Sequence, residues 1–173
     1  MDEKRVKVAE SNFRGFLNDG RIRKSIFQDI IYKTYMNNSQ ESLKVANELS
    51  KNKTSSLWVV VSSYYSMFYM ASAYVYKKGY KAGPEFVHNV IQEALIILAR
   101  HDLEKHFLDE YEEEKSKALS ASQNLLDAYE FEKAKRSEFQ YETTGEIKES
   151  KANTSLERAK KFIEVMRQIL KNS

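Results

Sequence analysis

The chain has three histidines, at positions 88, 101 and 106, and only His88 stands in a spacing typical of a metal site. It follows Glu85 by three positions, as in the Glu-x-x-His pairs of carboxylate-bridged dinuclear metal bundles. Such a site needs two pairs, and the sequence contains no second one. His101 and His106 are five positions apart, which does not set both on one helix face. We therefore expect no metal and no cofactor, with His101 and His106 at the surface.

Other signatures of catalysis are missing from the sequence. There is no cysteine, which excludes thiolate metal sites and a disulfide framework. A P-loop or a dinucleotide fold needs a glycine-rich turn after a strand, and five scattered glycines do not supply one. The His-Glu-x-x-His motif of helical metalloproteases does not occur either. The chain thus lacks the marks of these enzyme classes.

Composition predicts an all-α fold. A length of 173 residues indicates one domain that can bury a core without disulfides or a structural metal. Sheets need frequent tight turns, and five Gly and one Pro are few for such turns. Hydrophobic residues make up 42% and charged residues 31%, a balance typical of a globular chain. We expect long helices with short connections and no sheet.

Charge and hydropathy suggest a cytoplasmic protein. The net charge of +3 and the isoelectric point near 8.8 are only mildly basic and do not name a partner. The first seven residues, MDEKRVK, have no apolar stretch behind them, unlike a secretory signal. Residues 57–76 are long enough to cross a bilayer, but five Tyr and four Ser are spread through them. We read this window as a buried helix and expect no membrane partner.

Periodicity and turn residues divide the chain into helical segments. The helices are expected at residues 3–17, 26–49, 57–78, 85–99 continuing over 103–140, and 155–170. Thr54 or Ser55 can cap the third segment, Gly79 ends it, and Gly83-Pro84 starts the next. The segment over 57–78 is apolar almost all round, so it is either the centre of the bundle or part of a subunit interface. The charged run in residues 109–117 is expected to be largely a solvated face. The pattern favours an antiparallel four- to five-helix bundle, with residues 1–24 as an N-terminal helical arm.

Residues 63–79, SYYSMFYMASAYVYKKG, resemble the second core helix of the HEPN domain family, a Tyr-Tyr-x-Met-Phe run followed by small residues and a Lys-Gly end. The family often has a histidine where this chain has Tyr69. Three further segments resemble the family in the right order: residues 86–91 its third helix, 136–141 the Arg-x4-Tyr pattern of one branch, and 159–163 its closing helix. Residues 13–24 resemble a lead-in found in archaeal-type members.

The resemblance implies a HEPN-like bundle over residues 25–173 that forms a homodimer and binds a nucleotide or RNA. Many members are metal-independent ribonucleases that use an arginine followed, after four to six residues, by a histidine. A histidine can take the proton of the RNA 2′-hydroxyl, and an arginine stabilises the charge that develops on the phosphate. Here Arg136 is present, but Tyr141 stands in the histidine position. A phenol with a pKa of about 10 is a poor base at neutral pH, although it can donate to a phosphate oxygen.

The residues proposed on this resemblance fall into two groups. Contacts to nucleotide or RNA are assigned to Arg136, Tyr141, Tyr65 and Tyr69. In a nuclease, the catalytic residues would be Arg136, Tyr141 and His88. Each has a simpler interpretation: Arg136 as a solvated residue or an ion pair with the glutamate four positions before it, and Tyr141 as a helix cap. Tyr65 can be a core or interface residue, and His88 an ordinary first-turn residue.

Prokaryotic members of the family are commonly paired with a separate minimal nucleotidyltransferase in toxin–antitoxin modules. This chain lacks the Gly-Ser and paired-Asp signature of the transferase, so the resemblance makes it the HEPN half. Tyr141 is then a conceivable modification site. We carry two alternatives, a metal-independent RNA endonuclease of toxin type and a non-catalytic dimerisation module.

Overall fold

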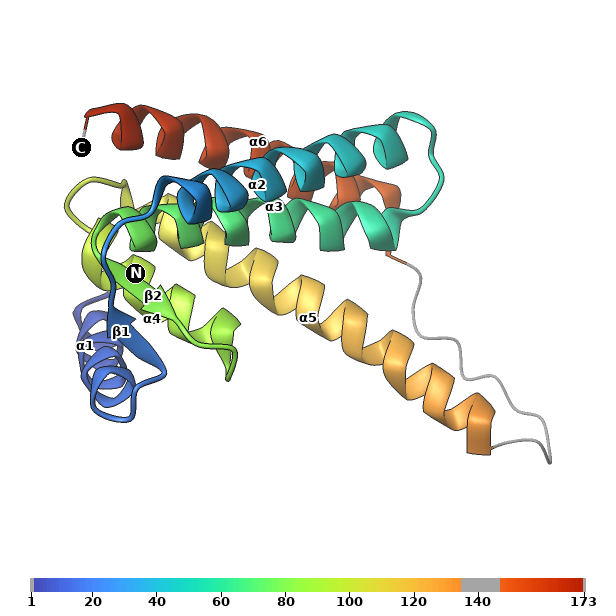
Figure 1. Cartoon of the computed structure of the whole chain (residues 1–173). Helices are drawn as coiled ribbons and strands as arrows, with labels where there is room; N and C mark the ends of the chain where they lie inside the picture. Colours follow the sequence, from blue (N-terminus) through green and yellow to red (C-terminus); the bar gives the residue numbers. More distant parts are fainter. Residues whose placement is uncertain (1, 135–146, 173) are drawn as a thin grey trace.

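The computed structural model describes residues 2–134 and 147–172, and in this part of the chain the predicted all-α bundle is confirmed (Figure 1). The elements in chain order are α1 (Glu3–Asn18), β1 (Ile22–Lys24), α2 (Asp29–Lys51), α3 (Ser56–Lys77), β2 (Tyr80–Ala82), α4 (Val87–Ala99), α5 (Lys105–Ala134) and α6 (Glu149–Asn172).

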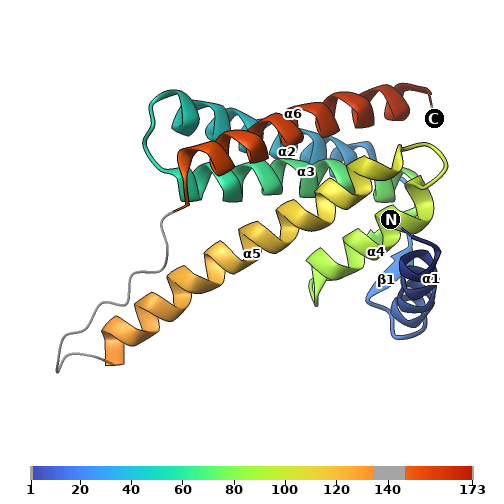
Figure 2. The same cartoon turned by 180° about the vertical axis from the view of Figure 1, so that it is seen from behind.

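Helix α3 forms the centre of the bundle. Four helices pack against it: α2 and α6 on one side, and α4 and α5 on the other (Figures 1 and 2). Ser55 caps its N-terminus, where the hydroxyl accepts a hydrogen bond from the Trp58 amide, and Gly79 follows its C-terminus with φ +88°. Most of its side chains are buried, as its nearly uniform apolar sequence predicts. Among the described helices, none combines the length and the apolarity needed to cross a membrane.

Helices α5 and α6 are joined by a buried ion pair. Glu114 of α5 is fully buried and accepts hydrogen bonds from Arg158 of α6 at 2.8 Å and from Lys117 at 3.0 Å. Tyr111, one turn earlier, is buried as well. The charged run of α5 is therefore not solvated on the face that carries these two residues, whereas Asp109, Glu113 and Ser116 are exposed.

A two-stranded ribbon corrects the expectation that the chain has no sheet. Strands β1 and β2 pair in antiparallel register, with Ile22 opposite Ala82. The two strands lie far apart in the sequence and are brought together by α2 and α3, so the ribbon needs no tight hairpin turn. Scarcity of glycine and proline therefore does not exclude it. Ile22 is fully buried, and the Phe13 ring of α1 contacts the Tyr80 ring at 5.4 Å between centroids.

Several helix starts differ from prediction. Helix α2 begins at Asp29 instead of residue 26, because the Tyr76 hydroxyl binds both the Ile26 carbonyl and the Gln28 amide and holds these residues outside the helix. Helix α4 begins at Val87 and not at Gly83-Pro84. Helix α6 begins six residues earlier than expected, at Glu149.

Candidate functional site

Three of the predicted site residues come together where α3 faces the start of α4. The Tyr65 ring lies 5.7 Å from the His88 ring and 6.1 Å from the Tyr69 ring, measured between centroids. All three side chains are half-buried. The other two predicted residues, Arg136 and Tyr141, lie outside the described residues.

His88 is held by a hydrogen bond and by ring contacts. Its Nδ1 lies 2.8 Å from the hydroxyl oxygen of Tyr64, which is fully buried in α3. The Phe68 ring lies 4.5 Å from the imidazole, centroid to centroid. The second ring nitrogen, Nε2, has no hydrogen-bond partner among the described residues. His88 thus packs against α3 from the first turn of α4.

Burial sets the protonation states of this pair. It lowers the pKa of His88 below its usual 6.5, and the nearby positive charge of Lys115 lowers it further. Burial also raises the pKa of the Tyr64 phenol far above its usual 10. Both groups are therefore neutral at pH 7. A neutral imidazole has two tautomers: Nε2 is a donor when Tyr64 donates to Nδ1, and a base when Nδ1 donates to Tyr64.

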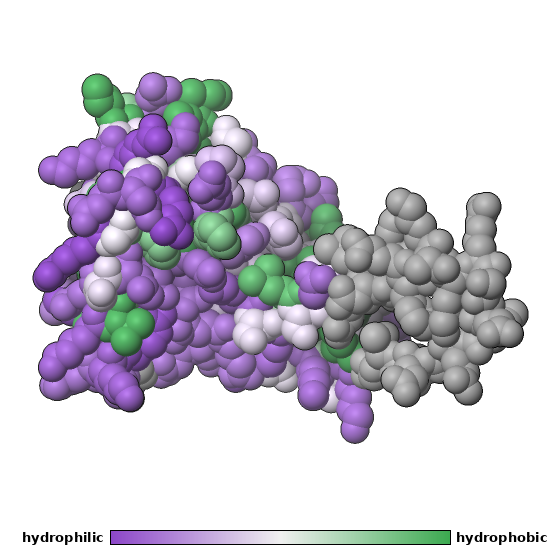
Figure 3. Space-filling model, turned by 90° about the horizontal axis from the view of Figure 1, so that it is seen from below, coloured by the Kyte–Doolittle hydropathy of each residue, from purple (hydrophilic) through white to green (hydrophobic). Residues whose placement is uncertain are grey.

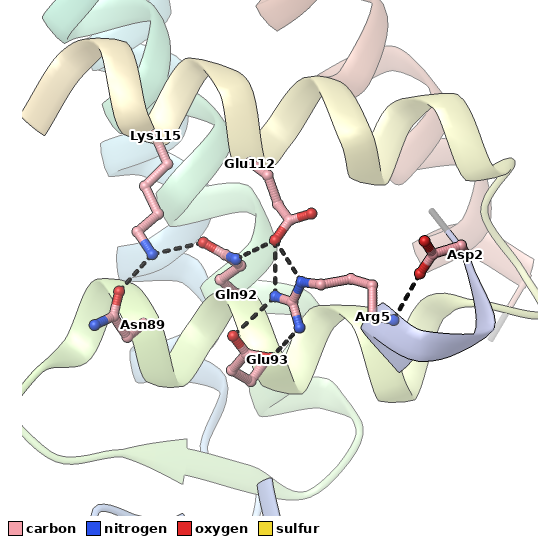
Figure 4. Close-up of polar contacts among 7 residues, drawn as sticks. All are labelled: Asp2, Arg5, Asn89, Gln92, Glu93, Glu112 and Lys115. Carbon is pink, nitrogen blue, oxygen red and sulfur yellow. Dashed lines mark hydrogen bonds and ion pairs between the residues drawn. The ribbon is translucent and has the colours of Figure 1, made fainter. Parts of the chain in front are cut away.

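Lys115 of α5 is the cation beside this pair, and the sequence did not single it out. Its ammonium group donates to Asn89 Oδ1 and, at 2.5 Å, to Gln92 Oε1, both on α4 (Figure 4). Its partners are therefore amide oxygens and not carboxylates. Burial lowers its pKa, and Glu93 and Glu112 oppose that effect.

The two carboxylates near Lys115 are bound by Arg5 of α1. Its guanidinium donates two hydrogen bonds to Glu93, at 2.7 and 2.8 Å, and a third from Nε to Glu112 at 2.8 Å (Figure 4). Such bidentate, charge-assisted bonds are among the stronger ones in proteins. The Asp2 side chain caps α1 beside them, accepting from the Arg5 amide at 2.7 Å. This network fastens α1 to α4 and α5, and it satisfies the carboxylates while Lys115 binds only neutral groups.

The comparison with protein families identifies the fold that carries this site. The family model described as the HEPN domain matches residues 32–169, which is most of the chain. The chain belongs to the HEPN domain family. A search of curated proteins and a search of solved structures each gave no match. The HEPN match begins in α2 and ends in α6, so it includes His88 and Lys115 and leaves α1 and β1 outside.

The site of this HEPN domain has three chemical capabilities. Aromatic rings can stack on a base, an ammonium group can bind a phosphate oxygen, and a neutral imidazole can donate or accept one proton. The sequence carries only a weak signal for Lys115. Apolar residues recur at helical spacing on α5 and indicate a buried face beside it: Leu108, Tyr111, Ala118 and Ala121. His101 and His106 are both exposed, as predicted.

Proposed function

We propose that this HEPN domain binds the phosphate and base of a nucleotide or an RNA strand at the site formed by Tyr65, Tyr69, His88 and Lys115. The observation that carries the proposal is the grouping of three aromatic rings next to a lysine whose hydrogen bonds within the described part of the chain go to two amide oxygens and not to a carboxylate. In the same proposal, Arg136 and Tyr141 supply further phosphate contacts.

The chemistry of Lys115 supports phosphate as the ligand. An ammonium group has three N–H donors, and the bonds to Asn89 and Gln92 use two of them. The third can donate to a phosphate oxygen, and a charge-assisted bond of this kind is about twice as strong as a neutral one. Half-exposed rings at Tyr65 and Tyr69 offer faces on which a base can stack, an interaction worth about 1–3 kcal/mol per base.

Calorimetry tests this proposal. Wild-type protein is titrated with ATP and with an RNA hexamer, beside the variant Lys115→Gln. We expect the variant to bind about tenfold more weakly, because it loses one charge-assisted bond. Lys105→Gln is the matched control, an exposed lysine at the start of the same helix, and it should bind like wild type. No heat from wild type at millimolar ligand would contradict the proposal and favour the non-catalytic dimerisation module.

We further propose that the protein acts as a homodimer through the layer formed by α2 and α3. This layer carries large apolar side chains with high exposure, including Ile30 at 70%, Trp58 at 50% and Val45 at 47%. Exposed apolar surface of this kind is typical of interaction sites. Sedimentation equilibrium should give twice the chain mass for wild type and a lower mass for Trp58→Arg. A wild-type monomer at high micromolar concentration would exclude the dimer.

The proposed setting is a toxin–antitoxin-like module with a separate minimal nucleotidyltransferase. Its support is the family membership together with the absence of the transferase signature from this sequence. If a neighbouring gene encodes a minimal nucleotidyltransferase, incubation with that enzyme and ATP should raise the mass of the chain by one nucleotide, and Tyr141→Phe should prevent the change. An unaltered wild-type mass would remove the modification from the proposal.

A metal-independent RNA endonuclease is the second candidate, and the neutral state of His88 favours it. In the tautomer with the proton on Nδ1, the Nε2 lone pair can take the proton of a 2′-hydroxyl group. Labelled RNA incubated in EDTA should then be cleaved by wild type but not by His88→Gln or Arg136→Ala. Cleavage by none of the three proteins would exclude the nuclease, and equal cleavage by all three would remove both residues from the mechanism.

A further inference from the structure

A second cationic site lies beside the ribbon and shares no lining residue with the site around His88. It is a groove of about 520 Å³ between the turn that precedes β1, the two strands, and the segment that follows β2. Four cations line it: Arg21, Arg23, Lys24 and Lys81. Two carboxylates line it as well, and both act on Arg21: Asp19 forms an ion pair with its guanidinium, and the charge of Glu85 raises its pKa.

The other three cations have no such partners. In the described part of the chain, no carboxylate forms an ion pair with Arg23, Lys24 or Lys81. Arg23 donates its Nε–H to the Gly20 carbonyl at 3.0 Å, which orients the guanidinium but leaves its charge uncompensated. All three side chains are exposed. The groove is therefore positively charged after the pairing of Arg21 is taken into account.

The register of the ribbon places two of these cations directly opposite each other. Arg23 pairs with Lys81 across the antiparallel strands. Residues in such a pair have Cβ atoms about 4.5–5.5 Å apart, and like charges there repel. A bound anion between them would turn this repulsion into attraction.

The described surface seen from below is mostly hydrophilic, with only scattered apolar patches (Figure 3).

An exposed aromatic ring adjoins the groove. Phe86 directly follows Glu85 of the lining, and 64% of it is exposed. Its φ of +51° lies in the left-handed region, which bulky residues rarely adopt, so the chain holds a large apolar ring in solvent in an unfavourable conformation. The Arg21 guanidinium carbon lies 5.6 Å from the centre of this ring. A cationic groove with an aromatic ring at its edge is the arrangement that binds single-stranded nucleic acid.

We propose that the ribbon groove binds the phosphodiester backbone of a single-stranded nucleic acid, with Arg23 and Lys81 on phosphates and a base stacked on Phe86. The groove shares no residue with the site around His88, and β1 lies outside the region that matches the HEPN model. Binding at the site around His88 and binding at the ribbon groove can therefore fail separately. Of the proposed contacts, Arg23 lies outside the region that matches the HEPN model, whereas Lys81 and Phe86 lie inside it.

Fluorescence anisotropy with labelled dodecamers of uridylate and of thymidylate tests the ribbon groove. The variant Arg23→Glu/Lys81→Glu should bind at least tenfold more weakly than wild type. Lys151→Glu/Lys161→Glu, which makes the same change of net charge at exposed lysines of α6, should stay within about twofold. In Arg23→Gln/Lys81→Gln, the slope of log K against log salt should become shallower by about 1.4, which is 0.7 for each lost phosphate contact. Phe86→Asn, which tolerates the left-handed backbone, should weaken binding about tenfold through lost stacking.

Each outcome separates the possibilities. Unchanged binding by Arg23→Glu/Lys81→Glu, or an equal loss in the α6 control, overturns the ribbon groove. Displacement of the labelled strands by a peptide of twelve glutamates at equal concentration also overturns it, because an acidic protein would then fit as well. Loss of strand binding in the groove variant together with unchanged ATP binding supports the groove and leaves the proposed function intact. If Lys115→Gln binds the strands like wild type and Arg23→Glu/Lys81→Glu loses strand binding, the result supports the ribbon groove and not the site around His88. Binding of either dodecamer supports the shared phosphodiester chemistry, and binding of neither by wild type overturns it.

Discussion

The buried Glu114 makes the stability of this helical bundle depend on one arginine. Arg158 of α6 donates to Glu114 at 2.8 Å, and its side chain is 24% exposed whereas that of Glu114 is fully buried. Removing one partner of a buried ion pair costs about 3–5 kcal/mol, because the remaining charge keeps its desolvation penalty. Lys117, whose ammonium group lies 3.0 Å from Glu114, remains to compensate part of the charge. For Arg158→Met, which keeps most of the aliphatic packing, we therefore expect a loss of about 3 kcal/mol.

Urea unfolding followed by circular dichroism measures this loss. With a slope of about 2 kcal/mol per molar urea, the midpoint should fall by about 1.5 M. The melting temperature should fall by roughly 6–12 °C, since about 2–4 °C correspond to each kcal/mol in a chain of this size. Lys160→Met is the control, because it removes an exposed ion pair to Glu157, and it should change stability by less than about 0.5 kcal/mol.

A double-mutant cycle separates the charge effect from lost packing. In a Glu114→Gln background the buried carboxylate is gone, so Arg158→Met should cost only about 1 kcal/mol there, giving a coupling of about 2 kcal/mol. If Arg158→Met costs less than 1 kcal/mol in the wild-type chain, or the same in both backgrounds, the ion pair does not stabilise the contact between α5 and α6 as argued.

Three further predictions concern protonation and backbone. Because the folded-state pKa of His88 is lowered below 6.5, the unfolded chain binds more protons just below that pH, and stability should be lost as the pH falls through about 6.5. Denaturant unfolding between about pH 7.5 and pH 5.5 should show this loss in wild type and in His101→Gln, and a smaller loss in His88→Gln; parallel profiles for all three would contradict it. Gly79 has φ +88°, so Gly79→Ala should lower the free energy of unfolding by about 1–2 kcal/mol in thermal unfolding. Gly15, whose added Cβ would meet nothing within 4 Å inside α1, should instead give about 0.5–1 kcal/mol of stabilisation as Gly15→Ala, and a loss there would refute the account.

The sequence predicts the helices well where side-chain spacing alone determines them. The nearly all-apolar segment of α3 had to be covered on several sides, and the bundle covers it with four helices. Helix starts are harder to predict, because they depend on contacts between distant residues. The start of α2 is an example, since it is set by the Tyr76 hydroxyl, which binds the Gln28 amide from another helix. The ribbon escaped prediction because each strand has only three residues and pairs with a distant partner.

The candidate site was only partly predictable. Tyr65 and Tyr69 are four positions apart on one helix, so their contact follows from helical geometry. The approach of His88 to the same rings depends on the crossing of α3 and α4, which no local pattern reports. Lys115 stands in a run of charges, where composition does not distinguish a buried cation from a solvated one. Only the structure shows that it binds two amides of α4.

The most direct test of the proposed function uses the three histidines themselves. Proton NMR resolves the imidazole Hε1 resonances of His88, His101 and His106, which can be assigned by single substitutions and followed during titration with ATP. We predict that ATP shifts the His88 resonance and raises its pKa, because a phosphate nearby favours the protonated imidazole. The two exposed histidines, His101 and His106, should not move. If the heat of ATP binding is recorded while the His88 resonance and its pKa stay unchanged, the ligand binds elsewhere and the proposed site is wrong.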